Sequence, residues 1–170
     1  TLLSELAPFA KFNSVTFEEN SSKVIGMISN ENEKLKEFAK NDHFSTYVYI
    51  SNNETKSNSC ISIENWEAGN KILGNYFLES NNIGKFRPLE LNYDKLRVSF
   101  DKGCYRGQEI VARMKYLGID RRSFLTFITT SKYDANENIK IVGKQIEIDD
   151  KLVFNAIVKK DLIPDIQKYP

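Results

Sequence analysis

The chain has 170 residues, which suits one ordinary domain or two small domains that share an interface. Hydrophobic residues make up 41% of the sequence, enough for a core, and charged residues make up 28%, typical of a soluble protein. The net charge of +1 argues against tight nucleic-acid binding, and no apolar run approaches the roughly 20 residues that span a bilayer.

The predicted elements begin with a short amphipathic helix over residues 2–13, whose apolar side chains share one face. Two strands are expected next, at 14–17 and 23–28, joined by a polar turn. Ser29 suits the N-cap of a second helix, which should end around 41–43. The apolar stripe of that helix consists of Leu35, Phe38 and Ala39.

The middle of the chain mixes strands and helices without a regular βαβ repeat. Aromatic and β-branched residues predict a strand at 46–50, and a further strand pattern resumes at Cys60 after a polar loop. Asn65 suits the N-cap of a helix that carries Trp66, and 79–88 is rich in turn residues. This order of elements predicts an α+β fold rather than a doubly wound one.

The last part of the chain is expected to be mostly strands. Alternating apolar residues predict a strand at 96–100, and a helix follows at 108–116 with Gly118 as its stop. Four short strands are then expected, at 123–130, 139–142, 146–148 and 152–158. They predict a small all-β tail, either a barrel or part of a sandwich.

The stretch DKGCYRGQEIVAR, at 101–113, has a composition suited to chemistry. Its cysteine, Cys104, is surrounded by cations and glycines, namely Lys102, Gly103, Arg106 and Gly107. Glycines permit a tight turn, and a helix N-terminus with nearby cations favours thiolate over thiol. This environment suits a nucleophile, a redox thiol or a soft-metal ligand. The alternative is a small apolar side chain at a strand–helix corner, with the glycines serving only the turn.

The same stretch resembles the signature of the YgfZ family. The matching residues are Lys102, Gly103, Cys104, Tyr105, Gly107, Gln108 and Glu109. Pro88 and Asn92 upstream, and 111–113 downstream, also match the family pattern. The resemblance implies a folate-binding protein that supports iron–sulfur cluster assembly and some tRNA modifications. YgfZ proteins are in turn similar to the aminomethyltransferase (T-protein) of the glycine cleavage system.

The resemblance also implies an architecture. It predicts a partial T-protein-like α/β-sandwich core that binds folate over 1–95, then a strand and the cysteine-motif helix over 96–118. A small C-terminal β-barrel is expected over 119–170. The amino-terminal part of typical members has no counterpart in this chain, so we expect it to bind tetrahydrofolate weakly at most.

The resemblance points to candidate cofactor-binding residues. The segment WEAG, at 66–69, is similar to one that contributes a glutamate to the pterin end of tetrahydrofolate, which makes Glu67 the candidate. A carboxylate can accept two hydrogen bonds from the pterin's ring N–H and amino group. The alternative for Glu67 is an ordinary solvated helix glutamate. Trp66 could stack on the pterin or serve packing, and Tyr105 and Arg113 are further candidates from the motif.

Two classes of function stay open. In the first, the protein is an assembly factor and Cys104 is its working thiol, helped by Lys102 and Glu109. In the second, it is a folate-dependent one-carbon transferase, whose Cys104 would need a nearby base. The sequence offers Glu109 as such a base and no histidine close by, so enzyme status stays uncertain.

No resident metal is expected. His43, the single histidine, lies in a polar corner without metal-ligand spacing. Iron–sulfur clusters usually have four protein ligands, mostly thiolates, and two cysteines cannot supply them. A cluster would therefore be transient and shared with another protein.

The cysteines and the net charge also indicate the cellular compartment and the classes of partner. Cys60 and Cys104 show no disulfide spacing, which predicts a reducing, cytoplasmic compartment. Expected partners are folate and iron–sulfur client proteins or cluster carriers, with no membrane, no direct specific nucleic acid, and a monomer or weak oligomer. Arg121 and Arg122 could contact a phosphate or a polyglutamate tail, or form a solvated turn.

Overall fold

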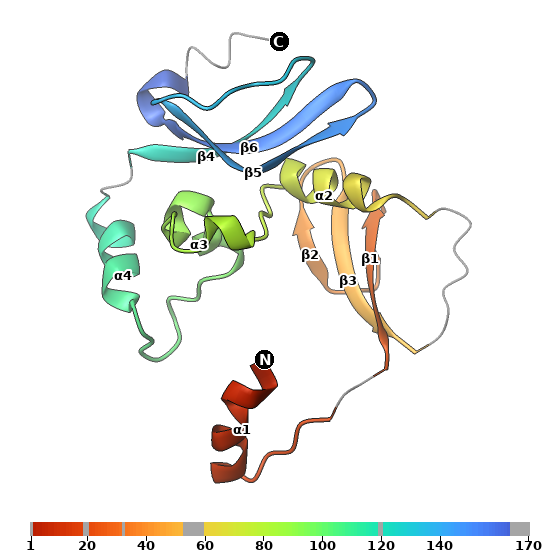
Figure 1. Cartoon of the computed structure of the whole chain (residues 1–170), viewed down its shortest axis with the longest axis vertical. Coiled ribbons are helices and arrows are strands. Elements are labelled where there is room, and N and C mark those ends of the chain that lie inside the picture. The colour runs from red at the N-terminus through yellow and green to blue at the C-terminus, as the bar shows by residue number, and fades with distance from the viewer. Residues whose placement is uncertain (1, 19–20, 32, 53–59, 119–120, 164–170) are drawn as a thin grey trace.

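The computed structural model describes residues 2–18, 21–31, 33–52, 60–118 and 121–163. These residues form two three-stranded antiparallel sheets with helices beside and between them (Figure 1). The helices are α1 (Leu2–Phe12), α2 (Ile63–Ile72), α3 (Tyr93–Leu96) and α4 (Gln108–Leu117), with short 3-10 turns η1 (Ser80–Asn82), η2 (Pro88–Leu91) and η3 (Lys160–Leu162). The strands are β1 (Lys23–Ser29), β2 (Glu37–Lys40), β3 (Ser45–Ser51), β4 (Arg122–Thr129), β5 (Ile139–Ile148) and β6 (Lys151–Lys159). The predicted α+β class is confirmed.

The first sheet has the order β1-β3-β2, and α2 packs closely on β1. Two glycines make this approach possible. A Cβ on Gly26 would lie 2.9 Å from the ring of Trp66, and one on Gly69 would lie 2.8 Å from Ile28 Cδ1. The ring of Trp66 therefore packs against the backbone of β1, which is one of the two roles that the sequence left open.

The second sheet has the order β4-β6-β5, and β6 forms its buried centre. The strands expected at 139–142 and 146–148 are one strand, β5, whose pairing shifts register between Val142 and Ile146. Gly143 lies in this irregularity with φ +72°, a conformation that favours glycine. The expected barrel is wrong: the described residues form an open sheet, and three strands are too few to close.

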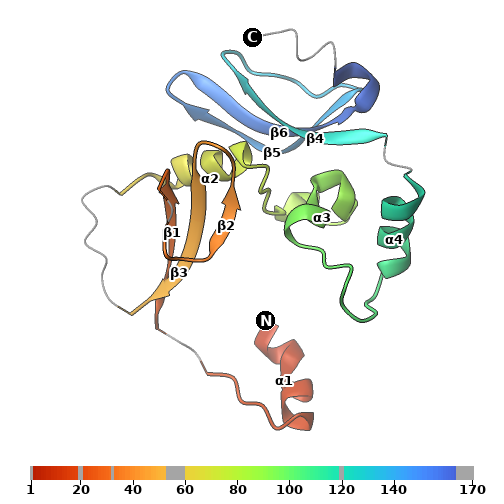
Figure 2. The same cartoon turned by 180° about the vertical axis from the view of Figure 1, so that it is seen from behind.

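Helix α2 joins the two sheets, as both views show (Figures 1 and 2). Its Ala68 packs with Ile146 and Val153 of the second sheet. Near its end, the carbonyl oxygen of Lys71 accepts hydrogen bonds from Thr126 Oγ1 at 2.6 Å and Asn155 Nδ2 at 3.0 Å. One turn of helix is thus held against β4 and β6 by buried polar contacts.

Several local expectations are wrong. The segment after Ser29 contains strand β2 instead of a helix, because it pairs with β3. Residues 14–17 and 96–100 form no strand, and neither has a ladder partner among the described residues. Helix α2 begins at Ile63, so Cys60 precedes a helix instead of beginning a strand.

The α2 boundary has a clear cause. Ser62 Oγ accepts a hydrogen bond from the backbone N–H of Asn65 at 3.2 Å, so Ser62 is the N-cap in place of Asn65. Helix α4 agrees with expectation, and Gly118 ends it with φ +62°. Among the described residues, no helix combines the length and apolar character needed to cross a membrane.

Candidate functional site

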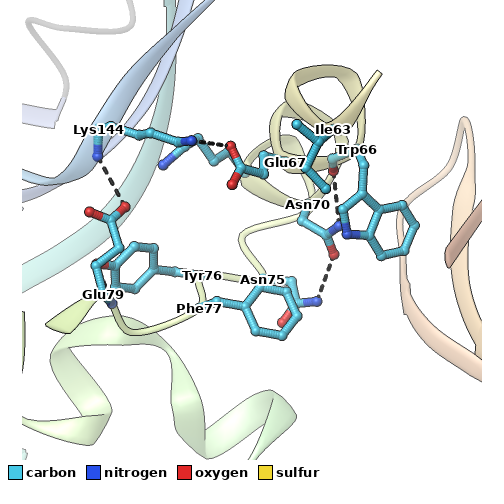
Figure 3. A pocket seen from close by; sticks show the side chains of 10 residues that line it. Ile63, Trp66, Glu67, Asn70, Asn75, Tyr76, Phe77, Glu79 and Lys144 are labelled. Carbon is cyan, nitrogen blue, oxygen red and sulfur yellow. Dashed lines mark hydrogen bonds and ion pairs between the residues drawn. The ribbon is translucent and has the colours of Figure 1, made fainter. Parts of the chain in front are cut away.

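A cavity of about 290 Å³ opens between α2, the segment that follows it and β5 (Figure 3). Its apolar walls come mainly from Ile63, Trp66, Tyr76 and Phe77. Its charged groups are two carboxylates and two ammonium groups: Glu67, Glu79, Lys71 and Lys144. Ligand cavities typically combine such apolar walls with a few convergent polar groups.

Glu67 and Glu79 both engage Lys144, which lies on β5 directly after Gly143. The ammonium of Lys144 is 2.5 Å from Glu67 Oε2, and its backbone N–H donates to Glu79 Oε1 at 3.2 Å (Figure 3). The hydrogen bond to Glu67 raises the pKa of Lys144. Glu67 is therefore not a freely solvated helix glutamate, and a ligand that binds it must share or displace Lys144.

Lys71 is the most buried charged group of the cavity, at 5% exposure. Its ammonium lies 5.6 Å from the centre of the Tyr76 ring. Burial lowers the pKa of Lys71, while the negative charges of Glu79 and Glu67 oppose that shift. Within the part of the chain that the structure describes, no carboxylate oxygen lies within 4 Å of this ammonium. It is a buried donor available to a ligand.

A chain of amide hydrogen bonds links residues that line the cavity. Asn70 Nδ2 donates to the Trp66 carbonyl oxygen at 2.9 Å, and Asn75 Nδ2 donates to Asn70 Oδ1 at 2.8 Å (Figure 3). Arg97 donates in turn to Asn75 Oδ1 at 2.9 Å and lies 4.7 Å from the centre of the Phe77 ring. These polar side chains are thus held in place by hydrogen bonds to one another.

The cysteine motif lies elsewhere, in the loop before α4. Gly107 has φ +86° at the N-cap of α4, as the predicted tight turn requires. Cys104 is an exposed free thiol. Lys102 places its ammonium 4.6 Å from the centre of the Tyr105 ring, and the Tyr105 hydroxyl is buried without a hydrogen-bond partner among the described residues.

The remaining motif candidates are on the surface of α4. Glu109 and Arg113 form an exposed ion pair at 3.6 Å. None of the five candidates in the motif lines the cavity that contains Trp66 and Glu67. The predicted site residues therefore fall into two groups, one in the cavity and one around Cys104.

Other candidates take simple positions. Cys60 is exposed, although its strand-like surroundings in the sequence favoured a buried side chain, and His43 is exposed with its backbone N–H donating to Asn41 Oδ1. Across residues 2–163, apart from the undescribed gaps, no group of three His, Cys, Asp or Glu side chains could hold a metal ion.

The sequence interpretation missed Lys71, Glu79 and Lys144. Lys71 follows Glu67 by one helical turn, so the spacing on α2 could have indicated a shared face. No local pattern indicates that Glu79 and Lys144 meet Glu67, since they come from distant segments.

The fold and the site define an α+β protein with an aromatic, charge-balanced cavity and a separate exposed thiol. The chain is 32% identical over 117 residues to the tRNA-modifying protein YgfZ of Klebsiella pneumoniae, which covers 60% of this chain and 36% of that relative. It is 39% identical over 64 residues to the tRNA-modifying protein YgfZ of Blochmanniella pennsylvanica, a match that covers 37% of this chain and 19% of that relative. It is 28% identical over 149 residues to an uncharacterized protein of Haemophilus influenzae, a match that covers 86% of this chain and 51% of that relative.

These matches confirm the resemblance, and the chain is similar in sequence to YgfZ proteins over part of its length. It spans about half or less of the length of these relatives. No family model matches the chain, and no solved structure matches it.

Proposed function

We propose that this chain is part of a cytoplasmic folate-binding protein that supports iron–sulfur cluster assembly or repair and, through cluster-dependent enzymes, tRNA modification. The observation that carries the proposal is the cavity that joins Glu67 and Trp66 to Lys71, a buried cation without a carboxylate at ion-pair distance among the described residues. The names of the YgfZ relatives, tRNA-modifying proteins, favour the last part of the proposal.

The cavity residues fit the pterin end of tetrahydrofolate. The carboxylate of Glu67 can accept hydrogen bonds from a ring N–H and an amino group, and the ammonium of Lys71 can donate to the ring carbonyl. This ammonium is buried, and no described carboxylate lies within ion-pair distance of it, which supports the fit because a ligand acceptor would give it a hydrogen bond. When bound, tetrahydrofolate would supply a carrier for one-carbon units.

Cys104 suits an encounter with another protein. Its thiol is exposed, so a client or carrier protein can reach it without a conformational change in this chain. A thiolate is a good ligand for iron in clusters, and the small number of cysteines makes such ligation shared and transient.

The separation of the two groups favours an assembly factor over a transferase. A transferase that uses Cys104 as nucleophile would need this thiol beside the folate, but Cys104 does not line the cavity. Glu109, the candidate base, is engaged with Arg113 on the surface of α4.

The folate part is tested by fluorescence, because Trp66 is the single tryptophan of the chain and lines the cavity. Titration with tetrahydrofolate should give weak but saturable quenching. Glu67→Gln should weaken binding by about tenfold or more, since one charge-assisted acceptor is lost. Glu64→Gln, on the same helix outside the cavity lining, is the matched control and should bind like the unmodified chain.

Glu67→Gln also removes the ion pair with Lys144, so a second variant is needed. Lys144→Met breaks the same ion pair but keeps the carboxylate. If Lys144→Met weakens binding as much as Glu67→Gln, then Glu67 contributes through its ion pair with Lys144 and does not contact the ligand itself. Because this chain is expected to bind weakly at most, the same substitutions are also made in the longer protein, where tetrahydrofolate binding that Glu67→Gln leaves unchanged would exclude this cavity as the folate site.

A further inference from the structure

A second hollow, of about 600 Å³, lies on the side of the molecule where η2, α4 and the start of β4 meet. Figure 2 shows α4 and the segment of α3 beneath the end of the second sheet. We call this hollow the basic groove, because five cations line it against one carboxylate. The cations are Lys85, Arg87, Arg121, Arg122 and Lys140, and the carboxylate is Glu90.

The basic groove continues into a neighbouring hollow of about 340 Å³, which shares Met114 and Arg122 with it. This extension adds three cations and one carboxylate, namely Lys95, Lys115, Lys160 and Asp94. The two hollows together form an extended track, longer than a site for one small anion. A polymer with regularly spaced negative charges suits such a track.

Both carboxylates of the track are already paired. Glu90 lies 3.8 Å from the guanidinium of Arg122, and Asp94 lies 3.1 Å from the ammonium of Lys115. Lys85, Arg121 and Lys140 are exposed, and within the described ranges none has a carboxylate at ion-pair distance. These three cations can therefore take an external anion without losing an internal ion pair.

The net charge of the chain conceals this concentration. The chain contains 24 Lys and Arg residues and 23 Asp and Glu residues. The two hollows contain eight of the basic residues but two of the acidic ones. The rest of the chain is therefore net acidic, and the positive potential is focused in one concave track.

The shape and composition of the track favour a phosphate backbone. Three of its cations are arginines, whose planar guanidinium groups bind phosphate oxygens in pairs. A concave surface does not match a flat bilayer. Phe86 also lines the groove, but it is half-buried and packs against the core cluster that contains Tyr76 and Leu91, so the track would hold RNA through its charges.

We propose that the basic groove and its extension bind the sugar–phosphate backbone of RNA without sequence specificity. The sequence predicts no direct specific nucleic-acid binding, because it reports only the net charge, whereas the groove depends on charge placement. The proposal uses no residue of the α2 cavity and does not depend on folate binding.

The test is fluorescence anisotropy with an unstructured, labelled RNA of about 20 nucleotides, at salt concentrations from about 50 to about 200 mM. The unmodified chain should bind at micromolar protein in low salt and lose affinity as salt rises. The triple variant Lys85→Gln/Arg121→Gln/Lys140→Gln should bind at least about tenfold more weakly. Its log–log salt slope should also be smaller by about 2, given about 0.7 per phosphate contact.

The matched control is Lys11→Gln/Lys34→Gln/Lys36→Gln, which removes the same charge from exposed positions outside the groove. It should bind RNA nearly as well as the unmodified chain, and circular dichroism should show that both variants fold. An equal loss in both variants, or no binding in low salt, would overturn the proposal. So would displacement of RNA by an equally long polyglutamate at equal charge concentration, which would indicate an acidic protein partner.

Discussion

The α2 cavity and the Cys104 loop are built in opposite ways. The loop is contiguous in sequence and exposes its central thiol. The cavity draws Glu67, Glu79 and Lys144 from three separate segments and buries the ammonium of Lys71. Under the proposed function, the loop would meet a partner protein and the cavity would hold a small molecule. Substitutions in the two regions should therefore have different consequences.

The largest expected effect is the loss of function caused by a substitution in the Cys104 loop. Cys104→Ser should abolish complementation of an iron–sulfur enzyme defect, because serine is neither a thiolate nucleophile nor a soft-metal ligand at neutral pH. The free energy of unfolding of the Cys104→Ser variant should differ from that of the unmodified chain by at most about 1 kcal/mol, since the side chain is exposed. Complementation is measured in the longer protein, and chemical denaturation in this chain.

Cys60→Ser is the matched control, because Cys60 is also exposed and lies outside the motif. It should complement fully. Full complementation by Cys104→Ser as well would leave only the structural interpretation of the motif, with the glycines serving the turn.

The second effect is on stability in the cavity. Asn70→Leu should lower the free energy of unfolding by about 2 kcal/mol, because buried partners in Asn75 and the Trp66 carbonyl lose their hydrogen bonds. Glu109→Gln in α4 should change it by less than about 0.5 kcal/mol, because its ion pair is exposed. Urea unfolding measures both, and equal losses would contradict the contrast between the two regions.

The smallest effect concerns Lys71 and pH. Burial lowers the pKa of Lys71 in the folded chain below its usual 10.5. At pH values between the folded-state pKa and 10.5, the unfolded chain therefore binds more protons than the folded chain. The contribution of this group to stability therefore rises with pH through that window. Lys71→Met removes the buried charge and should stabilise the chain at neutral pH, on the order of 1 kcal/mol.

That advantage should shrink as pH approaches 10.5, because the penalty on the ammonium disappears once both states are neutral. Lys34→Met, at an exposed position, controls for the loss of one surface charge. A stability difference between Lys71→Met and the unmodified chain that does not change with pH would show that burial of the ammonium is not its cause.

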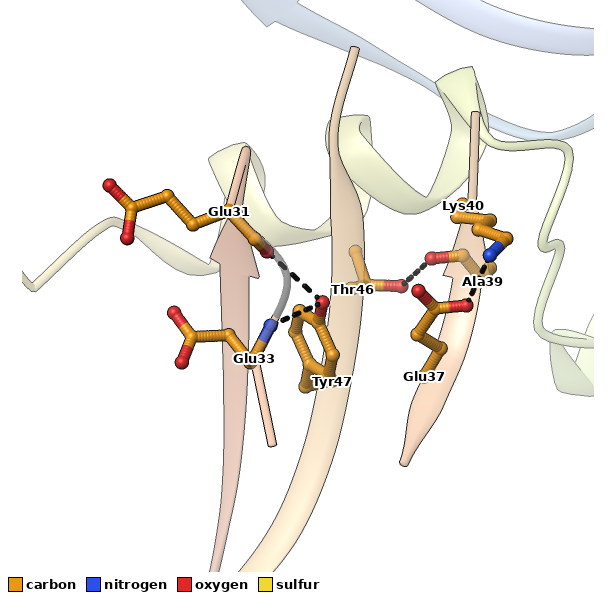
Figure 4. Close-up of polar contacts among 7 residues, drawn as sticks. All are labelled: Glu31, Glu33, Glu37, Ala39, Lys40, Thr46 and Tyr47. Carbon is orange, nitrogen blue, oxygen red and sulfur yellow. Dashed lines mark hydrogen bonds and ion pairs between the residues drawn. The ribbon is translucent and has the colours of Figure 1, made fainter. Parts of the chain in front are cut away.

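The segment after Ser29 shows how tertiary contacts override a local pattern. Ser29 Oγ does accept a hydrogen bond from the Glu31 N–H, as an N-cap would, but no helix follows among the described residues before β2. Instead, the Tyr47 hydroxyl on β3 accepts from the Glu33 N–H at 3.3 Å and donates to the Glu31 carbonyl at 3.2 Å (Figure 4). The Thr46 hydroxyl donates to the Ala39 carbonyl of β2 at 3.3 Å.

Local signals determined a large part of this protein. The core of β3, the helix α4 with its glycine stop and the central strand β6 follow from periodicity and turn residues, which act between near neighbours. The YgfZ motif and the WEAG segment are contiguous, so the sequence alone identified Cys104, Trp66 and Glu67 as candidates.

Only the tertiary structure decided which candidates share a site and where charge accumulates. Lys144 reaches Glu67 because β5 packs on α2. Arg121 and Lys140 line the same groove because β4 and β5 both pair with β6. Strand edges, cavities and electric potential depend on residues far apart in the chain, and no local pattern contains that information. A near-neutral sequence can thus fold into a protein with a strongly basic groove.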